Sequence, residues 1–532
     1  MPLLAAALCG LLLTLALPPL GWWPFAFAVA PVFALVARAR GARRAFWLGA
    51  TFAAPFFALY VLWLPRSFAE LFGPAFWAVY PFMLAVLSLF WGLTTWGAWR
   101  LAALSGGATP RARARRTIVY LPLLWVLVEW ARTQGYFAFP WGTLGYAWLD
   151  TPVAQLAAQV GVYGLSLLVV VPAALAAAPW AAPAAAPAAA PWAAPARTRA
   201  ARAAPATLAA AVLVGAAFLA GFAADDGAPE LGAPGSGAPE LRALLVQGDV
   251  DPFARAASAA GDLNTHLRLT EDAVSAAAAA GDPPFDLVVW PEGAVLGYDL
   301  GAGDAGPLRA AITDSAPGAT FIVGGRTYRG GRDYNSLLAL ERGAAVGRYD
   351  KHYLVPFGER WPLYEPLEGV YAAVFRAFGL PLLASTSPGE TVAPVATRVG
   401  LVGAYVCYES VFPQVQRELV ADGADVLVLA TNDAWFGVGA GAWQHFDMGR
   451  LRAIETRRWL LRAGNDGVTA AIDPWGRVTA EAPRGVPTTL TASFGPRTDL
   501  TFWVRYGGLT PALLLAALVA AAGIGAATRP RR

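Results

Sequence analysis

Lysine is nearly absent from this sequence of 532 residues, because 39 of its 40 basic residues are arginine and only Lys351 is lysine. An ammonium is a compact charge that can sit against a single oxygen, whereas guanidinium is a broad planar fork. Cysteine is also scarce, and Cys407 is the only one outside the first apolar segment. A solvated lysine and a small buried cysteine are the plain interpretations of two such residues. A third residue, described below, favours chemistry instead.

Histidine is scarce too, with three residues at His266, His352 and His445. A metal site needs clustered ligands, and no acidic cluster accompanies these scattered histidines, so we expect neither a metal nor a cofactor. We expect His266 on the surface of a helix, whereas His352 and His445 are candidates for lining a site. The net charge of +4 comes from arginines that lie between apolar segments, and it does not indicate nucleic acid.

Charge as a whole is scarce, because charged residues make up 14% of the chain against about 25% in a globular domain. The deficit is concentrated, since whole stretches carry no charged side chain: residues 1–37, 45–65, 71–99, 151–196, 203–224 and 506–528. About 20 apolar residues cross a bilayer as a helix. The sequence therefore predicts a polytopic α-helical membrane bundle with a polar insert.

Breaks in the apolar segments predict about eight transmembrane helices. We place them near residues 3–19, 22–37, 45–65, 75–99, 117–131, 153–178, 205–224 and 507–527. Arginines follow every even-numbered span, and arginine-rich loops stay in the cytoplasm. We therefore expect both termini in the cytoplasm of a bacterium and residues 225–505 outside its inner membrane, in the periplasm. The first span lacks the basic start and cleavage site of a secretory signal.

The pattern divides the chain into residues 1–224 with seven spans, a linker at 225–240, an exported domain at 241–495, and a last span with a basic tail at 496–532. In the exported domain, short β-rich runs alternate with helical stretches, which is typical of an α/β or α+β domain with buried central strands. We expect strands at 241–247, 286–290, 320–324, 336–340, 401–407, 425–431, 468–472 and 488–493. We expect helices near 255–280, 305–315, 411–421 and 443–462.

Candidate chemistry lies where polar residues follow predicted strands, because functional groups collect there. Glu292 follows a strand that Pro291 stops, Lys351 follows the polar run 347–350, and Cys407 ends an apolar strand. These three side chains suit nucleophilic catalysis. A carboxylate takes the thiol proton, the thiolate attacks, and an ammonium stabilises the thiolate and then the oxyanion. The backbone N–H of Tyr408 is placed to assist, and the product is a thioester.

The order Trp-Pro-Glu292, Lys351, then Cys407-Tyr-Glu resembles the nitrilase, or carbon–nitrogen hydrolase, superfamily. Further strings resemble the apolipoprotein N-acyltransferase family. They are Leu354-Val-Pro-Phe-Gly-Glu359, Thr431-Asn-Asp-Ala-Trp-Phe-Gly437, Gln444-His445, Arg452-Ala-Ile-Glu455 and Phe139-Pro-Trp-Gly142. The resemblance covers nearly the whole chain. It implies an αββα sandwich on a membrane bundle, and transfer of an acyl chain from a phospholipid, typically phosphatidylethanolamine, to the α-amine of a diacylglyceryl-cysteine at an apolipoprotein N-terminus.

By position, the resemblance implies that Glu292 is the general base, Lys351 the oxyanion stabiliser and Cys407 the nucleophile. It also implies supporting positions at Glu359, Tyr408 and Glu409. Asn335 is a further candidate supporting residue. Trp435 and Phe436 either pack the core or grip acyl chains, and their location after a predicted strand favours the acyl chains. The sequence departs from the family pattern at Arg360-Trp361, where Tyr-Val is commoner, and at Asp249, where Asn is usual. These departures affect details of the substrate more than the reaction.

Two other functions compete with acyl transfer. A membrane-tethered carbon–nitrogen hydrolase, an amidase for example, would use the same three residues with water as the acceptor, although one span would suffice as a tether. A transporter would leave Glu292, Lys351 and Cys407 unexplained, and charges inside the predicted spans are too few for ion coupling. The products separate transfer from hydrolysis, because only transfer yields an N-acylated peptide together with a lysophospholipid.

Overall fold

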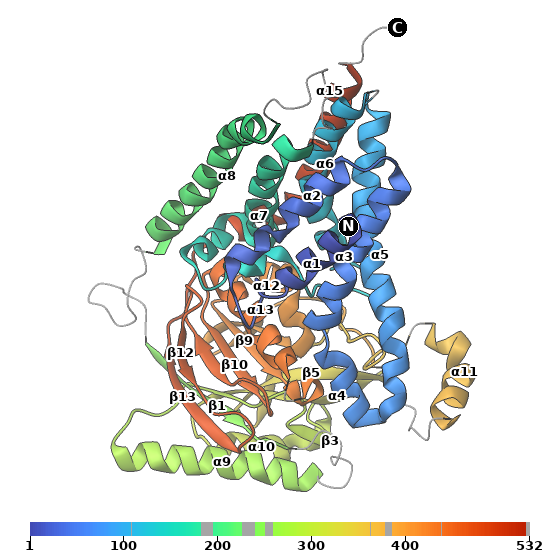
Figure 1. The fold of residues 1–532 in the computed structure, drawn as a ribbon. Helices are drawn as coiled ribbons and strands as arrows, with labels where there is room; N and C mark the ends of the chain where they lie inside the picture. The colour runs from blue at the N-terminus through green and yellow to red at the C-terminus, as the bar shows by residue number, and fades with distance from the viewer. Residues whose placement is uncertain are drawn as a thin grey trace. The chain divides into compact units, whose positions relative to one another are not determined.

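The computed structural model describes residues 1–107, 109–181, 195–225, 240–250, 259–361, 363–377, 386–437 and 439–527. The chain forms two compact units (Figure 1). One unit combines Met1–Asp226 with Tyr506–Arg532, so the two ends of the chain share it. The other unit is the intervening segment Gly227–Arg505.

The terminal unit is helical. Its α-helices are α1 (Pro2–Leu13), α2 (Val29–Ala37), α3 (Ala42–Tyr60), α4 (Trp63–Phe72), α5 (Val79–Leu104), α6 (Pro110–Ala131), α7 (Ala157–Ala181), α8 (Pro195–Asp225) and α15 (Thr510–Ala527). Aromatic side chains hold neighbouring helices together. The ring of Trp125 on α6 meets Phe33, Phe52 and Trp91 edge-on at centroid distances of 5.7, 5.8 and 5.6 Å, the arrangement that aromatic quadrupoles favour.

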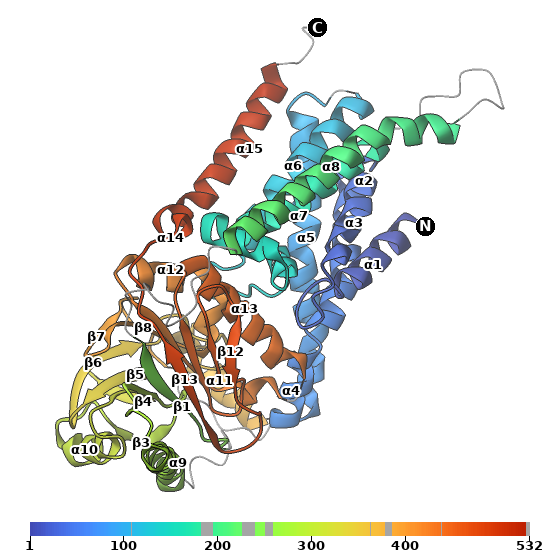
Figure 2. The ribbon, with the colours of Figure 1, turned by 90° about the vertical axis from the view of Figure 1, so that its left-hand side faces the viewer.

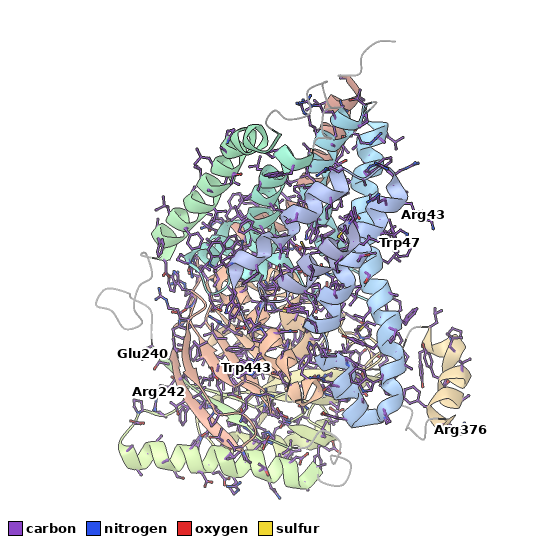
Figure 3. All side chains as sticks on the ribbon, in the orientation of Figure 1. Arg43, Trp47, Glu240, Arg242, Arg376 and Trp443 are labelled. Carbon is purple, nitrogen blue, oxygen red and sulfur yellow. The ribbon has the colours of Figure 1, made fainter. Side chains whose placement is uncertain are left out.

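Several of these helices suit a bilayer. Among the described residues, four helices are long and apolar enough to cross it, at Phe76–Leu104, Pro152–Ala181, Ala204–Asp225 and Phe502–Ala527. A bent pair, Ala42–Tyr60 with Trp63–Glu70, makes a fifth if it counts as one span. Arg43 and Trp47 of α3 point away from the neighbouring helices in Figure 3, and Trp47 is 51% exposed. The chain is thus a membrane protein with several candidate spans, and the predicted number of eight stays a prediction.

In its described residues, the middle unit contains two β-sheets. The seven-stranded sheet has the order β13-β1-β2-β4-β5-β6, with β3 also paired to β4, and the six-stranded sheet has the order β12-β11-β10-β9-β8-β7. The strands are β1 (Leu241–Gln247), β2 (Leu287–Val289), β3 (Val295–Asp299), β4 (Thr320–Arg329), β5 (Arg332–Glu341), β6 (Ala344–Asp350), β7 (Val395–Thr397), β8 (Gly400–Val406), β9 (Val426–Thr431), β10 (Leu460–Gly464), β11 (Ala470–Ile472), β12 (Val478–Glu481) and β13 (Thr488–Phe494).

Helices cover the two sheets, which lie between them in Figure 2. They are α9 (Ala259–Ala280), α10 (Gly306–Asp314), α12 (Pro413–Ala421) and α13 (Ala440–Thr456), and the unit also contains α11 (Tyr364–Ala377). Leu263 of α9 and Ile312 of α10 join the buried cluster of Val288 and Phe321 on the seven-stranded sheet. Helix α12 packs on β8 of the other sheet and against α13. The unit is therefore the expected α/β sandwich.

The central strands of each sheet run parallel. Strand β2 pairs in parallel with both β1 and β4, and β9 pairs in parallel with both β8 and β10. Parallel strands buried on both faces consist of near-continuous apolar runs, which is why β2, β8 and β9 are recognisable in the sequence. The carboxyl ends of such strands lie at one edge of each sheet, and functional groups collect at such an edge.

One predicted helix was wrong at its C-terminal end. The helix expected at 443–462 ends at Thr456, and Leu460–Gly464 is strand β10. Arg457 takes a left-handed conformation with φ of 52°, which stops α13, and the chain then pairs with β9 and β11. Strand β6 was not predicted either. Most of its residues are exposed or half-buried, so its sequence lacks the continuous apolar run that marks a buried strand.

Candidate active site

Three strand ends bring the predicted catalytic residues into one site. Glu292 lies three residues after β2, Lys351 directly follows β6, and Cys407 directly follows β8. Glu292 and Lys351 thus come from one sheet and Cys407 from the other. Glu292, Lys351 and Cys407 are all buried, with exposed fractions of 9%, 1% and 7%. A cysteine in ordinary core packing would have apolar neighbours, whereas this thiol experiences the charges of both Glu292 and Lys351.

A lysine, two carboxylates and an amide form a closed ring of hydrogen bonds. The Nζ of Lys351 lies 2.8 Å from Glu359 Oε2 and 3.3 Å from Glu292 Oε1. Opposite the lysine, Asn335 Nδ2 donates to Glu292 Oε1 at 2.7 Å and to Glu359 Oε1 at 2.8 Å. The backbone N–H of Asn432 donates to Glu292 Oε2 at 3.0 Å. Lys351, Asn335 and the Asn432 N–H are all donors, so the two carboxylates act as acceptors in every one of these contacts.

The charges in this ring oppose the cost of burial. Burial alone would lower the pKa of Lys351, but Glu292 and Glu359 outweigh it and raise that pKa above its ordinary value. Burial likewise works to raise the pKa of Glu359, and Lys351 outweighs it, so the pKa of Glu359 is lowered. Lys351 is therefore a permanently charged ammonium, and it is suited to stabilising negative charge rather than to accepting a proton.

Cys407 occupies a sharp turn between β8 and a short 3-10 helix, Cys407–Val411. Its φ is 49°, a left-handed conformation that is uncommon for a residue other than glycine. Burial raises the pKa of the Cys407 thiol, Glu292 raises it further, and Lys351 opposes both. The resting side chain is therefore a thiol, and a base must take its proton before it can attack. Glu292 is the carboxylate whose charge acts most strongly on it.

Glu409 fastens the turn to the segment that carries Lys351. Its Oε1 accepts from the Tyr349 hydroxyl at 2.8 Å and from the backbone N–H groups of His352 and Tyr353 at 2.8 and 3.0 Å. Its Oε2 accepts from the backbone N–H of Val406 at 2.8 Å. Burial raises the pKa of Glu409, and these donors oppose the shift. One buried carboxylate thus joins the end of β6 to the end of β8.

The remaining predicted residues lie around this turn. The ring of Tyr408 packs edge-on against Phe412 at 5.1 Å. Trp435 and Phe436 belong to the short helix Asp433–Phe436 after β9, where Trp435 is half-buried and Phe436 is buried against the ring of His445 at 5.1 Å. Phe436 thus contacts a protein side chain, and any hold on an acyl chain by Trp435 stays a prediction.

The sequence named His352 and His445 as candidates for lining a site without indicating what either contacts, and it misplaced His266. His266 is fully buried, because its Nδ1 lies 2.7 Å from the Asp262 carbonyl and its ring packs on Trp290 at 5.3 Å. Our prediction of a surface position was wrong. His352 Nδ1 lies 2.7 Å from the Gly389 carbonyl. His445 contacts the nucleophile turn itself, and its presence in the Gln444-His445 string was the only signal in the sequence.

Two family models match the chain. Residues 245–497 match the carbon-nitrogen hydrolase model, and residues 9–175 match the model of the apolipoprotein N-acyltransferase N-terminal domain. A solved carbon-nitrogen hydrolase from Helicobacter pylori G27 aligns over 48% of this chain and 89% of its own, at 17% identity and a TM-score of 0.37. The match of residues 245–497 to the carbon-nitrogen hydrolase model makes the middle unit a carbon–nitrogen hydrolase domain, and its sandwich and site agree with this.

Relatives that match along nearly the whole chain show which family within the carbon–nitrogen hydrolases it belongs to. The chain is 34% identical over 508 residues to an apolipoprotein N-acyltransferase of Caulobacter vibrioides, a match that covers 90% of this chain and 86% of the relative. It is 32% identical over 516 residues to one of Azotobacter vinelandii, covering 94% and 91%. The chain belongs to the apolipoprotein N-acyltransferase family.

Proposed function

We propose that this protein moves a fatty acyl chain from a phospholipid to the α-amine of the diacylglyceryl-cysteine of an apolipoprotein, through a thioester on Cys407. The observation that carries the proposal is the buried ring of Lys351, Glu292, Glu359 and Asn335 acting on a buried thiol. Family membership supports the acceptor and the lipid donor. Phosphatidylethanolamine is the expected donor, by the resemblance described above.

The first half-reaction loads the enzyme. Glu292 takes the Cys407 thiol proton, and the thiolate attacks the ester carbonyl of the phospholipid. Lys351 stabilises the oxyanion of the tetrahedral intermediate, with the Tyr408 N–H as a second donor. The intermediate collapses as the C–O bond breaks, and Glu292 returns its proton to the departing alkoxide. The products are a lysophospholipid and a thioester.

The second half-reaction unloads the enzyme onto the acceptor. The α-amine of the diacylglyceryl-cysteine attacks the thioester carbonyl, and Glu292 accepts a proton from the nitrogen. The C–S bond breaks and releases the Cys407 thiolate, which recovers the proton from Glu292. The product is an amide, and the enzyme returns to its starting state. Because the donor product leaves before the acceptor reacts, the kinetics are ping-pong.

We place the protein in the bacterial inner membrane with eight spans, both termini in the cytoplasm and the carbon–nitrogen hydrolase domain in the periplasm. The arginine distribution supports this orientation. The candidate spans at Phe76–Leu104, Pro152–Ala181, Ala204–Asp225 and Phe502–Ala527 support part of the count. A periplasmic domain would meet lipoprotein precursors after export, which the acceptor chemistry requires.

The decisive experiment follows the half-reactions separately. Purified protein is incubated with phosphatidylethanolamine alone, and intact mass and peptide mapping locate any adduct. We expect one acyl group on Cys407 and one lysophospholipid per site, with discharge when a diacylglyceryl peptide is added. Cys407→Ser should show no adduct. Continuous release of free fatty acid from phospholipid alone would instead favour the membrane-tethered hydrolase.

A further inference from the structure

His445 is a buried histidine that the proposed reaction does not use. Its Nε2 lies 3.0 Å from the carbonyl oxygen of Cys407 and 2.6 Å from Ser410 Oγ. The side chains of His445 and Ser410 are fully buried. A carbonyl oxygen only accepts hydrogen bonds, so the contact with Cys407 is a hydrogen bond only if Nε2 carries the proton. The Nε2–H group then makes a bifurcated hydrogen bond, with the Cys407 carbonyl oxygen and the Ser410 hydroxyl oxygen as its two acceptors.

The other side of the ring is held by an ion pair. His445 Nδ1 lies 3.0 Å from Asp433 Oδ1 and 3.1 Å from Arg462 Nη2. Arg462 also donates to Asp433 Oδ2, and Thr431 Oγ1 donates to Asp433 Oδ1 at 2.8 Å. Burial works to raise the pKa of Asp433, but Arg462 and His445 outweigh it and hold that pKa well below its usual range. Nδ1 can accept from Arg462 Nη2 while Nε2 donates, and the ionised Asp433 holds that guanidinium in place, so the ring keeps its position.

Space for this carboxylate depends on a glycine. A Cβ added to Gly467 would lie 2.1 Å from Asp433 Oδ2, so any other residue there would push the carboxylate away. The ring of Phe436 covers the imidazole at a centroid distance of 5.1 Å. A chain of contacts thus runs from Arg462 through Asp433 and His445 to the backbone of the nucleophile.

The bond to the Cys407 carbonyl also determines where the next N–H points. The peptide between Cys407 and Tyr408 is planar and trans, so its C=O and N–H point in opposite directions. Anchoring the oxygen on His445 therefore fixes the direction of the Tyr408 N–H. Donation to a carbonyl also polarises the peptide and strengthens the N–H as a donor. Glu409 anchors the preceding Val406 N–H, so the turn is held on both sides.

We propose that His445 is a positioning residue for acyl transfer, which holds the Cys407–Tyr408 peptide so that the Tyr408 N–H faces the oxyanion. The proposal rests on the proposed acyl chemistry, in which an oxyanion forms. It predicts a specific defect. Loss of the Nε2 contact should slow steps that pass through an oxyanion and should spare a displacement at the same sulfur that forms none.

The test uses the full-length chain in a Cys9→Ser background, in which Cys407 is the only thiol. Acyl loading is followed with a p-nitrophenyl ester as the burst of p-nitrophenolate, and thiol access with iodoacetamide, whose displacement forms no oxyanion. His445→Gln places an amide near the position of Nε2, whereas His445→Asn places one near Nδ1 and leaves the carbonyl unbound. His266→Asn, at an equally buried histidine outside the site, controls for loss of stability.

We expect His445→Asn to slow loading by about 10- to 100-fold, a part of the effect of deleting an oxyanion donor, while alkylation stays within about threefold. His445→Gln should recover most of the loading rate, and His266→Asn should load at nearly the parent rate per folded molecule. Equal loading by His445→Asn and the parent would overturn the proposal, as would a parallel fall in loading and alkylation. Because the ester is an artificial donor, this result stands apart from the phospholipid experiment above.

Discussion

Lys351 lies closer to Glu359 than to Glu292, with Nζ 2.8 Å from the first carboxylate and 3.3 Å from the second. All three side chains are largely buried. The supporting carboxylate thus carries the shorter ion pair, and Glu292 shares its lysine. This division leaves Glu292 able to gain a proton without leaving the ammonium uncompensated.

Glu359→Gln should therefore damage the site even though Glu359 does not take the proton in the proposed reaction. An amide nitrogen would face Lys351 or Asn335, both of which are donors. Breaking a buried pair on one side costs about 3 kcal/mol or more, so thermal unfolding should occur at a lower temperature and acyl loading should fall. Glu368→Gln, an exposed carboxylate on α11, is the matched control. A Glu359→Gln protein with parent stability and loading would show that Lys351 needs only Glu292.

Glu292→Gln should have opposite effects on two reactions of Cys407. Burial first and the charge of Glu292 second raise the pKa of the thiol, so removing that charge lowers the pKa. At any pH below that pKa, a larger thiolate fraction should make alkylation by iodoacetamide faster than in the parent. Acyl loading should be lost, because no base remains to cycle the proton. Slower alkylation in this variant would mean that Glu292 activates the thiol directly in alkylation as well.

Lys351→Arg tests whether charge alone suffices. The ammonium of Lys351 is buried and contacts two carboxylates. A planar guanidinium is larger and has a different shape, so it cannot make the same two contacts from the same position. We expect a loss of about 10²- to 10³-fold in the loading rate, which is typical for one oxyanion donor. Iodoacetamide mapping of Cys407 would confirm that the site remains accessible. Activity within a few-fold of the parent would exclude Lys351 as the oxyanion stabiliser.

Glu409→Gln should destabilise the junction between the ends of β6 and β8. Glutamine can still accept from three donors through one oxygen, but its NH₂ group would face the Val406 N–H or the other donors. An unsatisfied buried donor costs about 1–3 kcal/mol. A lower unfolding temperature and slower loading should appear together, because the same bond holds the nucleophile turn. Parent-like stability would show that the turn holds its shape without this carboxylate.

Membrane orientation can be checked with reporters. A reporter fused after Gly227 should behave as exported and one fused after Arg202 as cytoplasmic, because arginine-rich loops remain inside. The pair brackets the apolar part of α8, Ala204–Asp225. The reverse pattern would place the carbon–nitrogen hydrolase domain in the cytoplasm and rule out an exported lipoprotein as its acceptor.

The sequence by itself determined the features that depend on local pattern. Charge-free stretches predict membrane helices because a bilayer cannot accommodate unpaired charge, and β2, β8 and β9 are visible because buried parallel strands are continuously apolar. Glu292, Lys351 and Cys407 were identifiable for the same reason, since each follows such a strand or its polar neighbour. The single lysine stood out against 39 arginines.

Tertiary structure alone decided which side chains meet. Asn335 bridges Glu292 and Glu359 from positions 43 and 24 residues away, and no local pattern encodes such a contact. Strand β10 exists because β9 and β11 offer partners to Leu460–Gly464, although that segment continues a helical pattern. His445 reaches the Cys407 carbonyl across 38 residues because α13 packs against the nucleophile turn. Hydrogen bonds between distant segments form only when packing brings their donors and acceptors together, so the fold, and not local sequence, placed this histidine at the nucleophile.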